Sequence, residues 1–438
     1  MANRRVSMIS LGCPKNLVDS EGIVSDFLSH GIEVVVDPAD ADLVVVNTCG
    51  FLGSAREESL NAIRSACALK ADGLKAVFVT GCMVGNYAKE IHAAVPDIDR
   101  LIDFKDYARL PEMIDEIIPD VNKSKTGFVR PGNYVQARLT PAHFAYLKIS
   151  EGCNHNCTFC VIPSIRGRMR SLAFDDVLDK ARRLVQVGAK EINVVAQDST
   201  QYGIDLYGKR RIAELMQSVS ETDGLHWTRL LYAYPTEVDD DLIEILAADN
   251  KVLPYLDVPL QHSSGRVLER MRRQSSEKQV EDLLLKLRSR APDLVIRTTF
   301  IVGFPGETDA DFEHLMRFVD RHRIDRLGAF PYSPEPGSPA FDLEDAVPEE
   351  LKQERLDRLM TLQRGIAEEN NARFLGRDLE ILVEDPGIDD GKARGRSFAD
   401  APEIDGSVHL TGRAVAPGEL VQARVTETSA YDLEATII

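Results

Sequence analysis

The sequence lacks the long apolar runs that membrane insertion and export require. A membrane-spanning helix needs about 20 consecutive apolar residues, and no stretch of this 438-residue chain approaches that length. The apolar stretch near the start, Val6–Leu11, is too short for the core of a secretory signal peptide. We therefore expect a cytoplasmic protein with no membrane contact, whose seven cysteines serve metal binding or catalysis rather than disulfides.

Positive charge is also in short supply. The chain has 52 Lys and Arg residues against 70 Asp and Glu residues, a formal net charge of -18. Phosphate binding needs clustered cations, so this balance argues against a large generic nucleic-acid surface. It suits a basic partner better, although many acidic cytosolic enzymes have no such partner. The sequence also shows no acid–base pair, nucleophile triad or low-complexity tract.

The length favours two or three domains. We place an N-terminal domain at residues 1–121, a polar linker at 122–138, a central domain at 139–370 and a C-terminal domain at 371–438. In the first domain, continuous apolar strands alternate with helix-like stretches, which indicates a parallel α/β sheet. The expected strands are Val6–Leu11, Leu43–Val46 and Ala76–Thr80, and the expected helices include Asn16–Ser29 and Ala55–Lys70.

The central domain holds six further strand candidates separated by helix-like stretches. Because the usual barrel has eight βα units, six units predict a smaller or open (βα)6 barrel. A charged helix, Glu349–Asn370, closes this domain. The strands are Ala145–Ile149, Glu191–Ala196, Thr228–Ala233, Tyr255–Pro259, Val295–Val302 and Arg326–Pro331, and the helices include Phe174–Val187, Glu237–Ala248, Glu277–Arg290 and Asp309–His322.

The C-terminal domain changes character. Short strands at Leu379–Val383, Val408–Leu410 and Leu420–Val425 are separated by Pro-Gly, Asp-Gly and Thr-Gly turn signals. This pattern predicts a small all-β barrel.

Three cysteines follow the first strand of the central domain in a CxxxCxxC run. Cys153, Cys157 and Cys160 lie within EGCNHNCTFCVIP. A 4Fe–4S cube has four irons, so three thiolates leave one iron free to bind a substrate. The alternative is a structural zinc site with His155 as fourth ligand, but zinc sites normally use two separated pairs of ligands.

This motif at the end of the first strand of a six-unit barrel resembles the radical S-adenosylmethionine (SAM) superfamily. The resemblance implies that SAM binds the open iron through its amino and carboxylate groups. An electron from the cluster then cleaves SAM to a 5′-deoxyadenosyl radical. The barrel orients the reactants and keeps water away. The electron comes from a partner such as flavodoxin or ferredoxin.

A second trio of cysteines lies in the N-terminal domain. Cys13, Cys49 and Cys82 each come just after one of the three expected strands, in SLGC, VNTC and VTGC. Because the carboxyl ends of parallel strands meet at one edge of the sheet, these thiols can meet despite their separation in sequence. We expect a second, auxiliary 4Fe–4S cluster here, against the alternative of three unrelated buried cysteines. Cys67 lies in a helix-like run and is interpreted as an ordinary core cysteine.

Two cysteine trios followed by a small β-barrel resemble the methylthiotransferase family along essentially the whole chain. The resemblance implies a Rossmann- or flavodoxin-like domain with the auxiliary cluster, a radical-SAM core, and an OB-like TRAM domain that holds the substrate. It also implies insertion of a methylthio group at an unactivated C–H bond. One SAM supplies the methyl group, carried on sulfur at the auxiliary cluster, and a second supplies the radical.

The family has two branches, one of which modifies adenosine in tRNA (MiaB-like). The other modifies the β-carbon of an aspartate in the S-twelve protein of the small ribosomal subunit. Local sequences here resemble the second branch: Ser10–Glu21, Cys160–Ser171, Tyr255–Ser264 and Phe300–Thr308. We therefore favour the protein substrate and keep the tRNA branch as the alternative. A non-catalytic iron–sulfur carrier or sensor is a distant alternative, because a carrier scarcely needs a barrel.

Charge in the last domain adds an independent indication. Residues 371–438 contain seven Lys or Arg against thirteen Asp or Glu, a net of -6. An RNA-binding module is expected to be basic, whereas an acidic one suits a Lys/Arg-rich ribosomal protein, and simple solubility is the plainer explanation. We expect docking of the S-twelve protein, free or in the ribosome, and no strong tRNA binding. The carboxylates expected to speed that encounter are Asp389, Asp390, Asp400, Glu403 and Asp405.

Several other residues fall where barrel loops gather catalytic groups. By resemblance, the turn containing Gly303 lies beside SAM, and Phe159 packs over the cluster with its backbone near the adenine. The alternative for the turn is an ordinary βα connection in which Glu307 starts the next helix. Gln197, Asp198, Gln261 and His262 follow barrel strands as candidate contacts, and Arg166, Arg168 and Arg170 are either carboxylate-binding or simply exposed.

Overall fold

The computed structural model describes residues 4–119, 136–248, 250–387 and 391–438. The chain forms two compact units. One comprises Met1–Thr140, Cys160–Arg168 and Glu335–Ser338, and the other comprises Pro141–Phe159, Met169–Pro334 and Pro339–Ile438. Most of the expected linker at 122–138 lies outside the described residues, and the domain limits stay predictions. No helix in the described ranges has the length and apolar character to cross a membrane.

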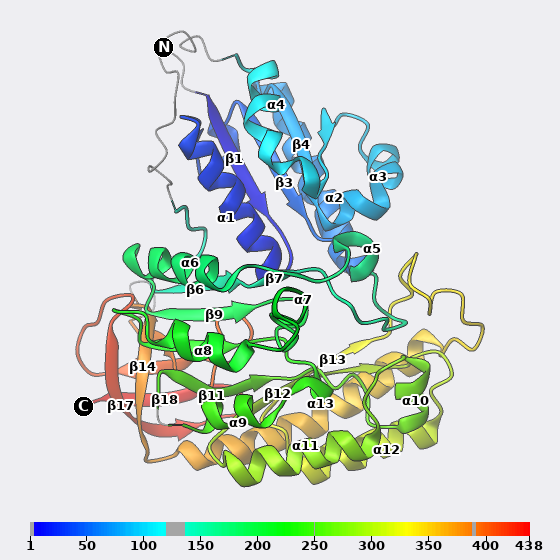
Figure 1. Ribbon diagram of the computed structural model, residues 1–438, viewed down its shortest axis with the longest axis vertical. Helices are drawn as coiled ribbons and strands as arrows, with labels where there is room; N and C mark the ends of the chain where they lie inside the picture. Colours follow the sequence, from blue (N-terminus) through cyan, green and yellow to red (C-terminus); the bar gives the residue numbers. More distant parts are fainter. Residues whose placement is uncertain (1–3, 120–135, 249, 388–390) are drawn as a thin grey trace. The chain divides into compact units, whose positions relative to one another are not determined.

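The first unit is built on a parallel sheet of five strands in the order β2-β1-β3-β4-β5 (Figure 1). Successive residues of a strand face opposite sides. Val44 and Val46 therefore pack with α2 and α3, whereas Leu43 and Val45 pack with α1 and α4. This is the predicted flavodoxin-like, doubly wound fold. The elements are β1 (Arg5–Ser10), α1 (Pro14–Ser29), β2 (Glu33–Val34), β3 (Leu43–Thr48), α2 (Gly53–Ala68), β4 (Ala76–Gly81), α3 (Cys82–Ala94), β5 (Arg100–Leu101) and α4 (Leu110–Ile117).

The second unit contains the predicted open barrel. Six parallel strands pair as neighbours in chain order, and β6 and β13 remain at the two edges. The strands are β6 (Phe144–Lys148), β9 (Glu191–Val195), β10 (Trp227–Leu230), β11 (Val252–Asp257), β12 (Val295–Val302) and β13 (Arg326–Pro331). The larger helices are α6 (Phe174–Gln186), α8 (Ile212–Ser220), α9 (Asp240–Ala247), α11 (Glu277–Arg290), α12 (Asp309–His322) and α13 (Glu349–Asn371). Shorter pieces are β7 (Ser150–Glu151), α5 (Ile162–Arg166), β8 (Arg170–Ser171), α7 (Ile204–Tyr207) and α10 (Gly265–Arg270).

Two predicted element boundaries differ from the structure for local reasons. The strand expected to reach Ala233 ends at Leu230, and Tyr232 takes a positive φ of 63° that an extended strand does not permit. The helix expected from Glu237 begins at Asp240, because the Asp239 side chain accepts a hydrogen bond from the Leu242 amide and caps the helix there.

The C-terminal segment forms a closed five-stranded barrel in the order β14-β15-β16-β18-β17, which confirms the small β-barrel. In Figure 1 it lies beside the end of the six-stranded sheet at which β9 and β11 begin. Its strands are β14 (Asp378–Asp385), β15 (Ala393–Arg396), β16 (Val408–Thr411), β17 (Leu420–Thr428) and β18 (Leu433–Ile437).

A buried ion network joins the two barrels of the second unit. Glu191, the first residue of β9, accepts hydrogen bonds from Arg229 Nε at 3.0 Å and from Arg396 Nη2 at 2.6 Å. The side chains of Glu191 and Arg229 are fully buried. Burial alone would raise the pKa of Glu191, but Arg396 and Arg229 outweigh it and hold the pKa below its usual value. Arg229 also donates to the Phe398 carbonyl at 2.7 Å, so the C-terminal domain is anchored at the base of the six-stranded barrel.

The acidic residues expected to attract a basic partner contribute to this same junction. Asp400 pairs with Arg326 at 3.0 Å. Asp405 accepts from the Tyr255 hydroxyl at 2.6 Å. Glu403 accepts from the Tyr146 hydroxyl at 3.0 Å. The choice of Asp400 as a docking residue is therefore wrong, because its carboxylate is buried and paired with Arg326, whereas Glu403 is exposed and its docking role stays a prediction. Asp389 and Asp390 lie outside the described residues.

Replacing Glu191 by Gln removes the charge from the centre of this network. Arg229 and Arg396 then keep buried charges with weakened compensation, so we expect a loss of about 3–5 kcal/mol of stability. Urea unfolding followed by tryptophan fluorescence measures the change, since Trp227 lies at the same junction and donates to Glu380 at 3.2 Å. Asp378→Asn, which breaks the exposed Asp378–Arg424 pair, is the control and should change little. Equal effects of the two variants would contradict an anchoring role for Glu191.

Candidate active site

The three N-terminal cysteines occupy equivalent positions at the carboxyl edge of the first sheet. Cys13 follows β1 and caps α1, Cys49 follows β3, and Cys82 follows β4 as the first residue of α3. Strand order reverses between β1 and β3, and ligands of doubly wound folds bind at such a switch point. The sequence placed these cysteines at the strand ends, and the structure has them there.

The loops that carry these cysteines touch one another. A Cβ on Gly12 would lie 2.9 Å from Cys49 Sγ, and one on Gly50 would lie 2.8 Å from the backbone of Met83. Any side chain at either position would collide with the neighbouring loop, so both positions require glycine. Ser59 on α2 fixes the middle loop by donating to the Cys49 carbonyl at 3.1 Å and accepting from its amide at 3.0 Å.

The thiols of this edge also interact electrostatically. Burial raises the pKa of Cys82 to about 11, the Arg166 guanidinium opposes the shift, and the Cys13 and Cys49 thiols add to it. Within the described ranges, no three His, Cys, Asp or Glu side chains are arranged to hold a single metal ion.

The CxxxCxxC run lies on the loop that leaves the first barrel strand. Its first two cysteines belong to the second unit, and Cys160 opens the segment 160–168 of the first. The pKa of Cys153 is raised to about 11, mainly by burial. The His155 amide, which donates to Cys153, offsets part of this rise. Arg273 Nη1 donates to Cys157 Sγ at 3.6 Å. The sulfurs of Cys153 and Cys157 thus each accept a hydrogen bond.

His155 supports this loop through its ring. Its Nε2 lies 2.6 Å from Asp198 Oδ2, and the ring stacks on Tyr234 with centroids 3.7 Å apart. Arg273 lies over the same Tyr234 ring at 4.1 Å. The contact of Nε2 with Asp198 and the stacking on Tyr234 together fix the orientation of the imidazole ring.

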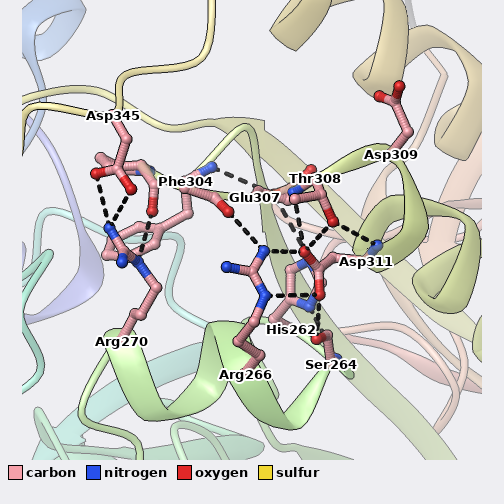
Figure 2. Close-up of polar contacts among 12 residues, drawn as sticks. His262, Ser264, Arg266, Arg270, Phe304, Glu307, Thr308, Asp309, Asp311 and Asp345 are labelled. Carbon is pink, nitrogen blue, oxygen red and sulfur yellow. Dashed lines mark hydrogen bonds and ion pairs between the residues drawn. The ribbon is translucent and has the colours of Figure 1, made fainter.

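The turn after β12 is held by a buried carboxylate (Figure 2). Glu307 Oε2 accepts from the amides of Gly303 and Phe304 at 2.7 and 3.2 Å. His262 Nε2 lies 3.5 Å from the same oxygen. The other oxygen, Oε1, pairs with Arg355 of α13 at 2.9 Å. Glu307 is therefore the brace of the turn and not the start of a helix.

Helix α12 begins one residue later. Thr308 is its N-cap, and Asp311 completes a capping box. From α10, Arg266 donates to the Gly306 carbonyl at 2.6 Å, and Arg270 donates to the Pro305 carbonyl at 3.0 Å (Figure 2). The two arginines fix the outward-facing carbonyls of the turn, so its backbone is held from both sides.

Comparison with known proteins identifies the family. The Radical SAM superfamily matches residues 147–319, the uncharacterized protein family UPF0004 matches 5–103, and the TRAM domain matches 375–438. The ribosomal protein uS12 methylthiotransferase RimO of Anaeromyxobacter sp. (strain Fw109-5) is 43% identical, covering 100% of this chain and 94% of that protein. The protein of the same name from Geobacter sulfurreducens is 41% identical, covering 100% and 99%. The chain belongs to the RimO family.

Solved structures agree on the fold. The radical SAM methyltransferase TsrM from Kitasatospora setae, with cobalamin and a [4Fe-4S] cluster bound, aligns with a TM-score of 0.55 at 15% identity, covering 78% of this chain and 77% of that chain. The cobalamin-dependent radical enzyme OxsB aligns with a TM-score of 0.52 at 12% identity, covering 82% and 56%. At these identities the likeness concerns the fold alone.

The two residues expected near SAM have local roles in this RimO-family chain. Phe159 packs against an apolar cluster that contains Val267, Met271 and Phe304. Gly303 has a φ of 71°, and a Cβ there would lie 2.3 Å from Lys352 Cγ. The need for glycine is thus explained by packing, and the SAM contacts of both residues stay predictions.

The other candidates from barrel loops all have protein partners. Gln197 donates to Glu151 at 2.9 Å, and Asp198 holds His155. Gln261 takes a positive φ of 72° and pairs through its backbone with Phe300. His262 accepts from the Ser264 amide at 2.9 Å. These residues therefore build the loops that surround the site.

The three arginines of the basic loop differ: one binds a carboxylate and two are exposed. Arg166 is buried and pairs with Asp19 at 2.9 Å, whereas Arg168 and Arg170 are exposed. Cys67 packs on the core from α2, in agreement with its interpretation. The sequence reasoning missed Tyr234 and Arg273. Tyr234 comes shortly after the third barrel strand, and that place was an available signal, whereas Arg273 follows α10 and offered none.

Glu307→Gln tests the brace of the turn. The amide keeps the shape of the side chain but leaves buried Arg355 without its buried counter-charge, so we expect a loss of about 3 kcal/mol and a lower midpoint of thermal unfolding. Asp309→Asn serves as the matched control. It removes the other carboxylate that pairs with Arg355, and the Asp309 side chain is 89% exposed. A midpoint lowered by Asp309→Asn but not by Glu307→Gln would show that the buried pair does not hold the turn.

Proposed function

We propose that the chain is a radical-SAM methylthiotransferase that adds a methylthio group to the β-carbon of an aspartate of ribosomal protein uS12. The observation that carries this function is the full-length similarity to RimO proteins. The positions of the two cysteine trios support it. The tRNA branch lacks such support, since the full-length relatives cited above carry the uS12 name.

Each cofactor has a set of residues suited to it. Cys13, Cys49 and Cys82 hold the auxiliary 4Fe–4S cluster at the switch point of the first sheet. Cys153, Cys157 and Cys160 hold the cluster that binds SAM, leaving one iron without a protein ligand. When bound, the clusters and two SAM molecules supply the sulfur, the methyl group and the radical that removes a hydrogen from the aspartate.

The chain's own residues hold and shield these groups. Arg273 and the His155 amide donate to the sulfurs of the SAM-cluster loop. Hydrogen bonds to the sulfurs are among the factors that set the reduction potential of a cluster. Glu307 fixes the turn that we place beside SAM with Gly303. Phe159 and its apolar neighbours exclude water from the loop, which protects a radical from side reactions.

The partner is a basic protein, and electrons come from a one-electron donor such as flavodoxin or ferredoxin. The net charge of -6 in residues 371–438 disfavours a phosphate backbone and favours a Lys/Arg-rich surface. Since Asp400 is buried and paired within the internal junction, the field that reaches a partner comes from the other carboxylates. We infer that the chain does not bind tRNA strongly.

Cysteine variants separate the two clusters. The reconstituted chain should bind about eight irons, and replacing either trio by Ala should leave about four. Loss of Cys153, Cys157 and Cys160 should abolish reductive cleavage of SAM. Loss of Cys13, Cys49 and Cys82 should leave cleavage but no methylthio product. Iron and sulfide analysis with chromatography of 5′-deoxyadenosine measures both. Methylthio product from the second variant would contradict an auxiliary sulfur source.

The substrate is tested in cells that lack the gene. Mass spectrometry of uS12 should show loss of one methylthio group, while the modified adenosines of tRNA should be unchanged. Complementation with the intact chain should restore the uS12 mass, and the Cys153→Ala variant should not. Loss of a methylthiolated adenosine with uS12 intact would move the chain to the tRNA branch without affecting the radical-SAM assignment.

A further inference from the structure

Arg166 is a buried arginine whose guanidinium reaches a cysteine of the N-terminal trio. It ends α5, within the segment 160–168 that packs in the first unit. Its Nη2 donates to Cys82 Sγ at 3.2 Å, and its side chain is 2% exposed. The ring of Phe104 lies 4.6 Å from the guanidinium carbon, so water has little access to this contact.

The position of the guanidinium is fixed by two further residues of α1. Asp19 Oδ2 accepts from Nη1 at 2.9 Å, and Asn16 Oδ1 accepts from Nη2 at 3.2 Å. Asn16 is itself held by the cysteine loops, because its amide donates to the Leu11 carbonyl at 2.7 Å and to the Thr48 carbonyl at 3.3 Å. The amide thus links the Arg166 fork to the loops of Cys13 and Cys49.

An ordinary buried salt bridge does not account for this arrangement. Besides pairing with Asp19 through Nη1, the guanidinium directs Nη2 at a sulfur and an amide oxygen. A neutral thiol is a weak acceptor, whereas a thiolate that ligates iron is charged and accepts strong hydrogen bonds. Arginine stays protonated in proteins. Its placement against a buried sulfur is favourable when that sulfur carries negative charge, and it opposes the rise in the pKa of Cys82 that burial causes.

We propose that Arg166 is a positioning residue of the auxiliary cluster, which hydrogen-bonds the Cys82 sulfur, retains this ligand on its iron and raises the reduction potential of the cluster. The inference rests on the proposed function in assuming that Cys13, Cys49 and Cys82 hold a cluster. Hydrogen bonds to the sulfurs and net charge are among the factors that set such potentials. Because Arg166 follows Cys160 by six residues, one stretch of chain serves both cysteine trios.

The test uses the full-length chain with Cys153, Cys157 and Cys160 replaced by Ala, so that iron is held only by the N-terminal trio. Arg166→Gln, Arg166→Lys and Arg168→Gln are compared in this background after anaerobic reconstitution. Arg168 is the matched control, since it is exposed and lies on the same segment. The readouts are the midpoint potential from an EPR-monitored titration and the rate of iron release to a chelator.

We expect Arg166→Gln to shift the potential to more negative values and to release iron several-fold faster. Arg166→Lys should fall between, because it keeps the charge but loses the planar fork, and Arg168→Gln should match the parent. Circular dichroism checks that each variant is folded. A parent without iron would overturn the auxiliary site itself. A parent with iron whose potential and release rate are unchanged by Arg166→Gln would overturn only the role of Arg166, as would loss of folding that lysine does not rescue.

Discussion

The carboxylate of Glu191 is the interaction on which the second unit depends. It receives Arg229 from the neighbouring strand and Arg396 from the C-terminal barrel, so one buried charge joins two domains. A buried carboxylate is tolerated when both oxygens are paired, and here each oxygen has its own arginine. Parallel strands all start at the same end of the barrel, and the buried charge pairs of Glu191 lie at that end. The opposite end, where the strands finish, is left for the loops that carry chemistry.

Within each unit, a guanidinium also lies beside a cysteine sulfur. Arg273 donates to Cys157, and Arg166 donates to Cys82. In each trio of cysteines, therefore, a sulfur accepts a hydrogen bond from an arginine, although the two arginines come from separate parts of the chain. Burial disfavours thiolate, and a fixed cation or amide donor offsets that effect. An arginine donor beside a cysteine sulfur in each unit suits the proposed role of these cysteines as metal ligands.

Strands and helices with strong periodicity could be predicted from the sequence, and charge contacts could not. Val295–Val302 is a strand with the predicted bounds, because it is rich in β-branched and aromatic residues. β2 and β5 have two residues each and leave no pattern to detect. The choice of Asp400 as a docking residue failed because net charge does not report position: its partner, Arg326, lies 74 residues away in sequence. The cysteine positions succeeded because strand ends are themselves predictable.

The residues around the CxxxCxxC loop show how far that reasoning extends. His155, Asp198, Tyr234 and Arg273 come after β6, β9, β10 and β11 in turn, one from each successive βα unit. His155 contacts both Asp198 and the ring of Tyr234, and Arg273 also lies over that ring. Parallel topology brings such positions together whatever residues occupy them, so the gathering of the first three was predictable and its chemistry was not.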